Sequence, residues 1–252
     1  MKIIYAKTPE EVAKISADIV ADVIKNNPKA TMGLATGSSP VGMYNELARK
    51  NKAGEITFKD VHTVNLDEYV GLPAEHDQSY VYFMRKNLFY NIDIKLENTN
   101  LPNGMAEDAE AECRRYDEVV AANSPIDIQV LGIGNNGHIG FNEPTDHFSK
   151  GAVLVDLTDS TIDANSRFFE RREDVPTRAI SMGIGQIMQA KKIIMVAQGK
   201  GKAEILEQAF FGPVTPMVPA SILQFANDVV LCADEEALSV IMEKHPEAVT
   251  KA

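Results

Sequence analysis

The chain has 252 residues, of which 44% are hydrophobic, enough for one large α/β domain or two small ones. Its 36 acidic and 25 basic residues give a net charge of -11, which repels polyanions and argues against nucleic-acid binding. No apolar run approaches the roughly 18 residues of a membrane helix, and the charged N-terminus does not fit a signal peptide. The two cysteines, Cys113 and Cys232, lack metal-ligand spacing and suit packing roles in a reducing cytoplasm.

Strand-like and helix-like segments alternate along the whole chain. The first helix is predicted to begin with Thr8 as N-cap, Pro9 at the first helical position and Glu11 closing a capping box. Several strands are continuous Val/Ile/Leu runs, which suit a parallel sheet covered on both faces. We therefore expect one domain, 1–252, with a doubly wound, mostly parallel α/β sheet that is Rossmann-like but binds no dinucleotide. The predicted strands are 31–35, 61–66, 126–131, 153–157, 179–184, 193–197 and 229–232, and the other predicted helices are 40–50, 79–89, 106–121, 202–210 and 235–242.

The first predicted strand runs into Thr36-Gly37-Ser38-Ser39-Pro40 and then into a helix. Pro40 suits the first helical position, and Ser39 suits the N-cap. Such a junction presents free backbone N–H groups at the positive end of a helix dipole, and the hydroxyls of Thr36, Ser38 and Ser39 add further donors. The junction predicts a phosphate monoester site, with an ordinary capped turn as the alternative. It is not a Walker A loop, because the Gly-Lys-Ser/Thr ending is absent.

Two carboxylates, those of Asp67 and Glu68, follow the next predicted strand and precede Tyr69. Asp67 is expected to leave the strand end and to face the crevice in which α/β proteins bind their ligands. A carboxylate partly withdrawn from water there can act as a general base on a C–H proton. The alternative is that Asp67 or Glu68 caps the segment that follows.

The segment from Gly132 to Pro144 reads Gly-Ile-Gly-Asn-Asn-Gly-His-Ile-Gly-Phe-Asn-Glu-Pro and follows another predicted strand. Glycines such as Gly132 and Gly140 let the backbone approach a ligand closely. His138 supplies an imidazole, the side chain that titrates nearest neutral pH, and Glu143 can orient that ring and stabilise its cation. The combination predicts a catalytic loop, and a glycine-rich turn with a surface histidine is the simpler alternative.

An anionic substrate on this acidic chain needs cations gathered at one place. Arg167 lies among apolar neighbours in the sequence Asn-Ser-Arg-Phe-Phe. Lys202 follows a predicted strand and a glycine turn, at a second strand-to-helix junction. Either cation could meet a phosphate, and a solvated surface charge is the alternative for each.

Together these motifs resemble the glucosamine-6-phosphate deaminase family of sugar-phosphate isomerase-deaminases. The resemblance covers almost the whole chain, and its segments are 36–40, 67–72, 132–144 and 164–169. It implies conversion of glucosamine 6-phosphate and water to fructose 6-phosphate and ammonia, in cytoplasmic amino-sugar catabolism. Neither ring opening nor proton transfer at carbon requires a metal or an organic cofactor.

The resemblance also implies roles for individual residues. The family residue matching His138 assists opening of the sugar ring, and the one matching Glu143 supports that histidine. The residue matching Asp67 then moves a proton from C2 to C1 through an enolamine, after which water adds at C2 and ammonia leaves. A closed pyranose has no acidic C2 proton, so ring opening must come first. By resemblance, the phosphate site consists of Ser38, Ser39, Arg167 and Lys202.

Two departures from the family pattern change the expectation. Asn136 stands where members often carry Asp, so we expect a Glu143–His138 pair in which Asn136 contributes only hydrogen bonds. Val153 and Val155 stand where larger, hexameric members carry the cations of an effector site. We therefore expect no allosteric activation, and a monomer or a small homo-oligomer.

Two other functions fit part of the pattern. A 6-phosphogluconolactonase shares the fold and a related glycine–histidine loop, but Asn142-Glu143-Pro144 and the segment 65–69 favour the deaminase. A non-catalytic sugar-phosphate sensor should carry a DNA-binding element or lack the base. No helix-turn-helix extension is visible, and Asp67 is present.

Overall fold

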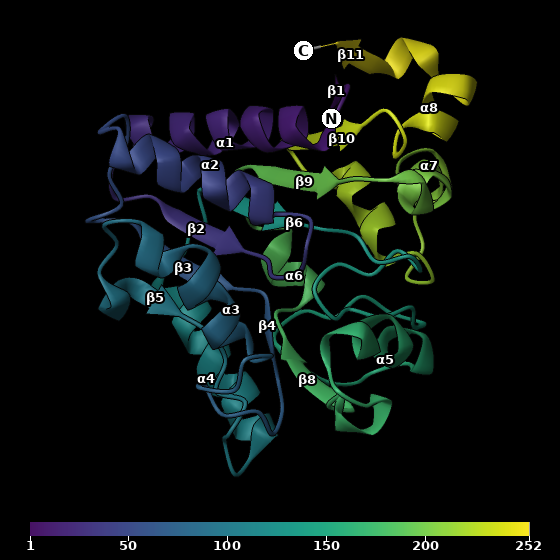
Figure 1. Ribbon diagram of the computed structural model, residues 1–252. Helices are drawn as coiled ribbons and strands as arrows, with labels where there is room; N and C mark the ends of the chain where they lie inside the picture. The colour runs from purple at the N-terminus through teal and green to yellow at the C-terminus, as the bar shows by residue number, and fades with distance from the viewer. Residues whose placement is uncertain (252) are drawn as a thin grey trace.

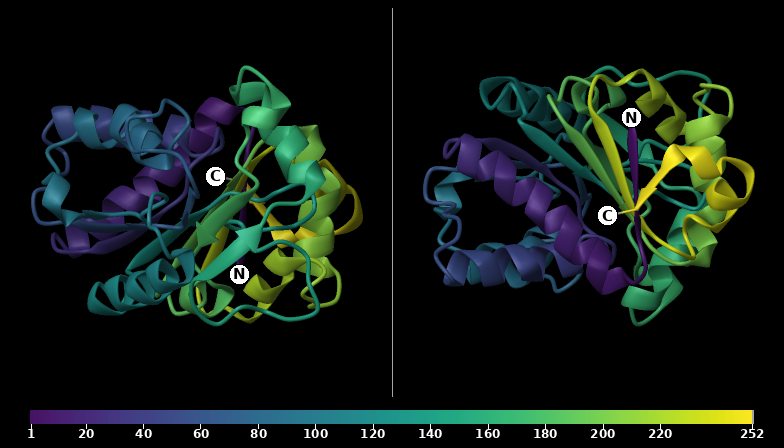
Figure 2. Two further views of the ribbon diagram at one scale, coloured as in Figure 1. Left: turned by 90° about the horizontal axis from the view of Figure 1, so that it is seen from below. Right: turned by 90° about the horizontal axis from the view of Figure 1, so that it is seen from above.

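The computed structural model describes residues 1–251, and its centre is an eight-stranded sheet in the order β11-β1-β10-β9-β6-β2-β3-β5. All paired neighbours in this sheet are parallel, and helices cover both faces, with α1 and α2 on one side and α4 and α7 on the other (Figures 1 and 2). The prediction of a doubly wound, mostly parallel fold is confirmed. The strands are β1 (Lys2–Ala6), β2 (Thr31–Leu34), β3 (His62–Asn65), β5 (Thr99–Asn100), β6 (Ile128–Leu131), β9 (Ile193–Ala197), β10 (Val229–Asp234) and β11 (Val249–Lys251).

Six helices follow the predicted segments, with ends that shift by a few residues, whereas α5 and α6 were not predicted. Short apolar strands alternate with these helices because each βαβ unit buries one helix face against the sheet. Within residues 1–251, no helix combines the length and apolar character required to cross a bilayer. The helices are α1 (Pro9–Asn26), α2 (Val41–Lys52), α3 (Tyr80–Asn87), α4 (Ala109–Ala122), α5 (Asp159–Asn165), α6 (Ile184–Ile187), α7 (Ala203–Phe211) and α8 (Ser239–Lys244).

Two predicted strands, 153–157 and 179–184, do not belong to the parallel sheet. They form β7 (Val153–Asp156) and β8 (Arg178–Ser181), which pair antiparallel in a separate sheet of order β4-β8-β7. The third strand of that sheet, β4 (Asp67–Tyr69), pairs antiparallel with β8. The expectation of one sheet was wrong here because a short apolar run specifies a strand but not its partner.

Two predicted helix caps are also corrected. Thr8 Oγ accepts from the backbone N–H of Glu11 at 3.3 Å, but the Glu11 carboxylate accepts from the N–H of Lys7, not of Thr8. In α2 the N-cap is Pro40, whose φ of -83° is already helical, and Ser39 lies one residue outside the helix. The chain therefore enters α2 later than predicted, and the Ser39 hydroxyl is not used as a helix cap.

The sheet has a switch point between β2 and β6, which are neighbours in the order of strands. The chain leaves β2 for β3 on one side, and it leaves β6 toward β9 on the other side. Loops that diverge at such a point open a crevice beyond the carboxyl ends of the strands. The predicted phosphate junction follows β2, and the predicted catalytic loop follows β6, so the fold brings the two together.

Gly104 should be required by the packing around β4. A Cβ placed on Gly104 would lie 2.0 Å from the carbonyl oxygen of Tyr69, whose strand is paired with β8 and cannot easily move. We expect Gly104→Ala to lower the free energy of unfolding by about 1–3 kcal/mol, the usual cost of overpacking. Urea denaturation measures this change. Gly201→Ala is the matched control, since a Cβ there meets nothing within 4 Å; equal stability of the two variants would contradict the prediction.

Candidate active site

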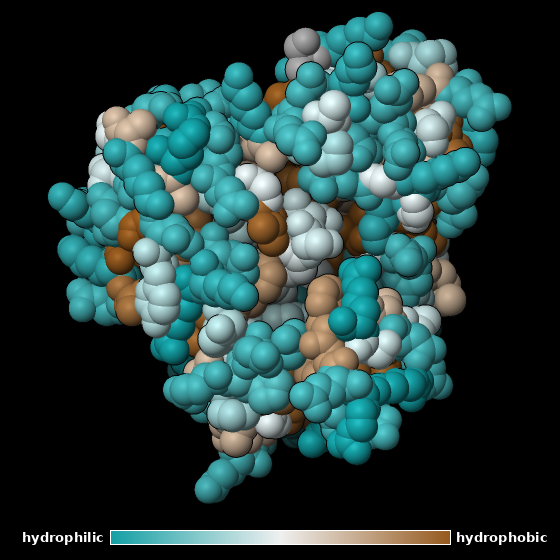
Figure 3. All heavy atoms as spheres, in the orientation of Figure 1, coloured by the Kyte–Doolittle hydropathy of each residue, from teal (hydrophilic) through white to brown (hydrophobic). Residues whose placement is uncertain are grey.

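A pocket of about 880 Å³ opens at the switch point of the sheet. In Figure 3, pale and brown side chains gather at the middle of the face and hydrophilic ones surround them. Every residue predicted for the site lines this pocket except Glu143, which lies behind His138. The lining includes Thr36, Gly37, Ser38, Ser39, Asp67, Gly132, Asn136, His138, Gly140, Arg167 and Lys202.

Asp67 reaches the pocket by a different route from the one expected. Leu66 still bonds to the parallel sheet through Leu34, but its carbonyl accepts from Met182, and the chain crosses into the antiparallel sheet. Asp67 is therefore the first residue of β4, opposite Ser181, and not a strand-end side chain. It lies beside the glycine loop, because a Cβ on Gly140 would be 3.5 Å from Asp67 Oδ2.

The Asp67 carboxyl is buried, with 5% of the residue exposed, and no hydrogen bond to it is formed within residues 1–251. Burial and the adjacent Glu68 charge raise the pKa of Asp67 to about 8. A carboxylate with this pKa is a much stronger base than one in water. The arrangement suits removal of a proton from carbon.

Glu68 has a different role from Asp67, although the two are adjacent. Its carboxylate accepts from the backbone N–H groups of Tyr69, Tyr80 and Val81, each at 2.9 Å. Tyr80 and Val81 are the first two residues of α3, so Glu68 caps that helix from outside it. Burial raises the pKa of Glu68 to about 7, against the opposing effect of these three bonds. The capping alternative from the sequence therefore describes Glu68.

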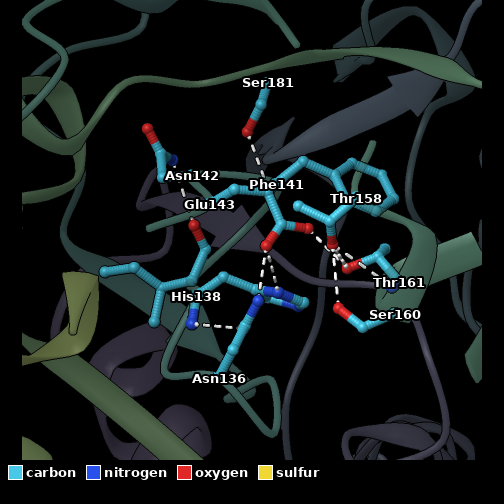
Figure 4. Close-up of polar contacts among 10 residues, drawn as sticks. Asn136, His138, Phe141, Asn142, Glu143, Thr158, Ser160, Thr161 and Ser181 are labelled. Carbon is cyan, nitrogen blue, oxygen red and sulfur yellow. Dashed lines mark hydrogen bonds and ion pairs between the residues drawn. The ribbon is translucent and has the colours of Figure 1, made fainter. Parts of the chain in front are cut away.

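His138, Glu143 and Asn136 form a connected cluster in the loop after β6 (Figure 4). Nδ1 of His138 lies 3.4 Å from Oε2 of Glu143, and the Asn136 side-chain N–H₂ donates to the same oxygen at 2.6 Å. Oδ1 of Asn136 accepts from the backbone N–H of His138 at 3.2 Å. The ring lies against Gly134, where a Cβ would be only 2.4 Å from it. The loop therefore fixes the imidazole beside one carboxylate.

Thr161 is a contact that the sequence did not suggest. Its hydroxyl donates to Oε1 of Glu143 at 2.5 Å, so both carboxylate oxygens have donors. Burial alone would raise the pKa of Glu143, but bonding to His138, with its charge, and the donors Thr161 and Asn136 hold the pKa below its ordinary value. Glu143 is thus kept anionic. The only sequence signal for Thr161 is its place in the first turn of α5, behind the N-cap Thr158.

The two predicted cations meet at one side of the pocket. Lys202 Nζ donates to Oδ1 of Asn135 at 2.7 Å, and the Arg167 guanidinium lies over the Phe168 ring at 4.7 Å from its centroid. Burial and the charge of Arg167 lower the pKa of Lys202. An anion between the two would relieve this repulsion, so the pair suits a phosphate group. Lys202 was predicted as the first helical residue, but it is the N-cap of α7, which begins at Ala203.

Val153 and Val155 lie outside the pocket, in β7 of the antiparallel sheet. They pair with Ser181 and Ala179 of β8, and both are half-buried. These aliphatic side chains offer no charge to a phosphate.

Comparison of sequences gives the relatives of this chain. The profile of a family described as glucosamine-6-phosphate isomerases/6-phosphogluconolactonase matches residues 6–232. A glucosamine-6-phosphate deaminase of Clostridium perfringens (strain 13 / Type A) is 51% identical over 241 residues, 96% of this chain and 100% of that protein. A protein of the same name from Thermoanaerobacter sp. (strain X514) is 50% identical over 244 residues, 97% of this chain and 96% of that one.

Comparison of structures agrees with the sequences. A monomeric glucosamine-6-phosphate deaminase superposes with a TM-score of 0.93 at 43% identity, over 95% of this chain and 100% of that one. A 6-phosphogluconolactonase of Thermotoga maritima gives a TM-score of 0.73 at 17% identity, over 92% of this chain and 99% of that one, which shows a likeness of fold alone. The profile match and the half-identical relatives show that this chain belongs to the glucosamine-6-phosphate isomerase/6-phosphogluconolactonase family.

Proposed function

We propose that this enzyme converts glucosamine 6-phosphate and water to fructose 6-phosphate and ammonia, in amino-sugar catabolism. The observation that carries the proposal is the buried carboxylate of Asp67, which has no hydrogen-bond partner among residues 1–251 and lines the same pocket as His138 and the two cations. The relatives named glucosamine-6-phosphate deaminase, at about half identity over nearly full length, support the same substrate.

Ring opening is the first chemical step. The bound pyranose must lose the proton of its C1 hydroxyl while its ring oxygen gains one. His138 transfers that proton from the C1 hydroxyl to the ring oxygen of the sugar. While the imidazole of His138 holds the proton, Glu143 stabilises the resulting imidazolium. Asn136 donates to Glu143 and accepts from the His138 backbone, so it holds both partners in place.

Proton transfer between carbons is the second step. In the open chain the C2 hydrogen is acidified by the C1 carbonyl, and Asp67 removes it. Asp67 returns the proton to C1, and a proton of the C2 amino group passes to the former carbonyl oxygen, which leaves a hydroxyl at C1 and an imine at C2. Water adds to that carbon and ammonia departs, so that the products are fructose 6-phosphate and ammonia. After water adds, a proton moves to the nitrogen, the C2–N bond breaks with loss of ammonia, and the C2 hydroxyl loses its proton to become the ketone carbonyl.

The phosphate is assigned to the pocket side formed by Ser38, Ser39, Arg167 and Lys202. We propose that the active form is a monomer, by analogy with the monomeric deaminase of the same fold. We also propose that the chain forms one domain. The two buried, free thiols of Cys113 and Cys232 fit a reducing cytoplasm. A net charge of -11 disfavours nucleic acid as a partner.

Release of ammonia from glucosamine 6-phosphate tests the proposed activity directly. Parallel incubation with 6-phosphogluconolactone separates the deaminase from a lactonase, whose only structural support is the shared fold. Loss of lactone without release of ammonia would show that the function is assigned wrongly. Binding of the sugar phosphate with no turnover would indicate a sensor.

Asp67→Asn should abolish proton transfer at C2, because an amide cannot act as the base. We expect a loss of ~10²–10⁴ in kcat, the range for removal of a general base. Exchange of the C2 hydrogen with solvent, followed by NMR in D₂O, measures the step itself. Exchange at the wild-type rate in this variant would contradict the assignment of Asp67.

The stability of the same variant is the control for folding. The folded-state pKa of Asp67 lies near 8 and the ordinary value is 3.8, so ionisation favours the unfolded chain. The cost is absent below the unfolded pKa, grows as pH rises, and is complete above about 8. Asp67→Asn should therefore be more stable than wild type by on the order of a few kcal/mol at pH 9, and equal at pH 3.

Arg167→Ala and Lys202→Ala should each raise KM for glucosamine 6-phosphate by roughly 10–100-fold, the value of a charge-assisted hydrogen bond. Steady-state kinetics measures the change. Lys200→Ala is the matched control, because it removes the same charge from an exposed side chain outside the pocket. If wild type turned over unphosphorylated glucosamine with the same kcat/KM, the phosphate site would be refuted.

Initial rates should follow a hyperbola in glucosamine 6-phosphate, with or without N-acetylglucosamine 6-phosphate. Val153 and Val155 cannot form charge-assisted bonds to an effector phosphate, and burying one against them without partners is costly. A ligand shifts an equilibrium only by binding two states differently. A sigmoidal curve that becomes hyperbolic on addition of the acetylated sugar would contradict this prediction and point to an effector site elsewhere.

A further inference from the structure

The Glu143 carboxylate is held by two different parts of the chain. Oε2 receives bonds from the loop after β6, through Asn136 and His138. Oε1 receives its bond from Thr161, which belongs to α5 and lies 18 positions further along the chain. Figure 4 shows Thr161 and Asn136 on opposite sides of this carboxylate. The alignment of Glu143 with His138 therefore depends on where α5 lies.

The hydroxyls around Thr161 direct its hydrogen onto Glu143. Thr158 Oγ donates to Thr161 Oγ at 3.1 Å, which leaves the hydrogen of Thr161 for the carboxylate. Ser160 Oγ lies 3.0 Å from Thr158 Oγ, and it must be the donor there because Thr158 has a single hydrogen. Ser160 is exposed and lines the pocket. A row of hydroxyls thus runs from the pocket to the buried carboxylate.

The segment that carries Thr161 also carries the phosphate-binding arginine. α5 (Asp159–Asn165) continues directly into the 3-10 turn Ser166–Phe168, which contains Arg167. Asn165, the last residue of α5, donates from its side chain to the hydroxyl of Tyr69 at 2.9 Å, and Tyr69 belongs to the same strand as Asp67. One short helical segment therefore contacts the general-base strand, the Glu143 carboxylate and the phosphate position.

We propose that Thr161 is a positioning residue, which holds Glu143 against His138 and makes that alignment depend on the substrate phosphate bound by Arg167. The inference rests on the proposed deaminase function. When Arg167 is engaged by phosphate, the 3-10 turn and α5 are held against the pocket, and the Thr161 hydroxyl holds Oε1 in place. When it is not engaged, α5 is held less firmly, and the Thr161 hydroxyl fixes Oε1 less well. Phosphate binding then serves the ring-opening step as well as affinity.

Thr161→Val removes the hydroxyl and keeps the shape of the side chain. We expect kcat for ammonia release to fall about 10-fold or more, since one oxygen of a buried carboxylate loses its donor. KM should change less than about 2-fold, since the Thr161 hydroxyl donates to Glu143 and is not one of the groups assigned to the phosphate. Thr161→Ser retains the hydroxyl and should restore kcat to within about 3-fold of wild type. Should the valine variant fail to fold, Thr161→Ala provides the same comparison with Thr161→Ser.

A double-mutant cycle in kcat tests the link between Thr161 and Arg167. Arg167→Ala should lower kcat in the wild-type background and have at least 3-fold less effect on kcat in the Thr161→Val background. Lys202→Ala is the control, because it removes a cation from the same phosphate position, but Lys202 precedes α7 and donates to Asn135, outside the segment that carries Thr161 and Arg167. Its effect on kcat should be the same in both backgrounds.

The outcomes separate this inference from the proposed function. A wild-type protein that releases no ammonia contradicts the deaminase assignment itself. An active wild type with an unchanged kcat in Thr161→Val, or with equally low kcat in Thr161→Val and Thr161→Ser, refutes the role of the hydroxyl. Strictly additive effects of Arg167→Ala and Thr161→Val refute the dependence on phosphate.

Discussion

The burial of the Asp67 carboxylate is the constraint on which the rest of the site depends. Holding an ionised group away from water costs free energy, and no donor in residues 1–251 compensates it. Successive side chains of β4 point in opposite directions, so Asp67 faces the pocket and Glu68 faces the N-terminus of α3. The three backbone hydrogen bonds that Glu68 accepts hold β4 against α3. The negative charge of Glu68 also raises the pKa of Asp67.

The sheet explains why residues so distant in sequence act together. The loops after β2 and β6 diverge at the switch point and supply hydroxyls from one side and the imidazole from the other. The antiparallel sheet then brings Asp67 beside the glycine loop, since β8 pairs with β4 and Ser181 Oγ accepts from the backbone N–H of Phe141 at 3.0 Å. The second sheet therefore joins the general base to the loop that carries His138.

Much of this was predictable from sequence because the decisive signals are local. Apolar runs such as 193–197 predicted strands that the structure contains, and the strand-to-helix junctions predicted residues that line the pocket. The separate sheet was not predictable, because a short apolar run does not specify its partner: β8 pairs with β7, which is near in sequence, and with β4, which is more than a hundred positions away. Thr161 was missed for the same reason: a threonine in a first helical turn is common, and only the fold places it against Glu143.

Asn136 shows how a neutral residue can replace an acidic one in such a cluster. An aspartate here would put a second negative charge at 2.6 Å from Glu143 Oε2, and one of the two would have to take up a proton. The amide donates to that oxygen and accepts from the His138 backbone, so it satisfies both neighbours without repulsion. A single carboxylate then balances the imidazolium. The orientation of the His138 ring therefore depends on how firmly Glu143 is held by its bonds to Asn136 and Thr161.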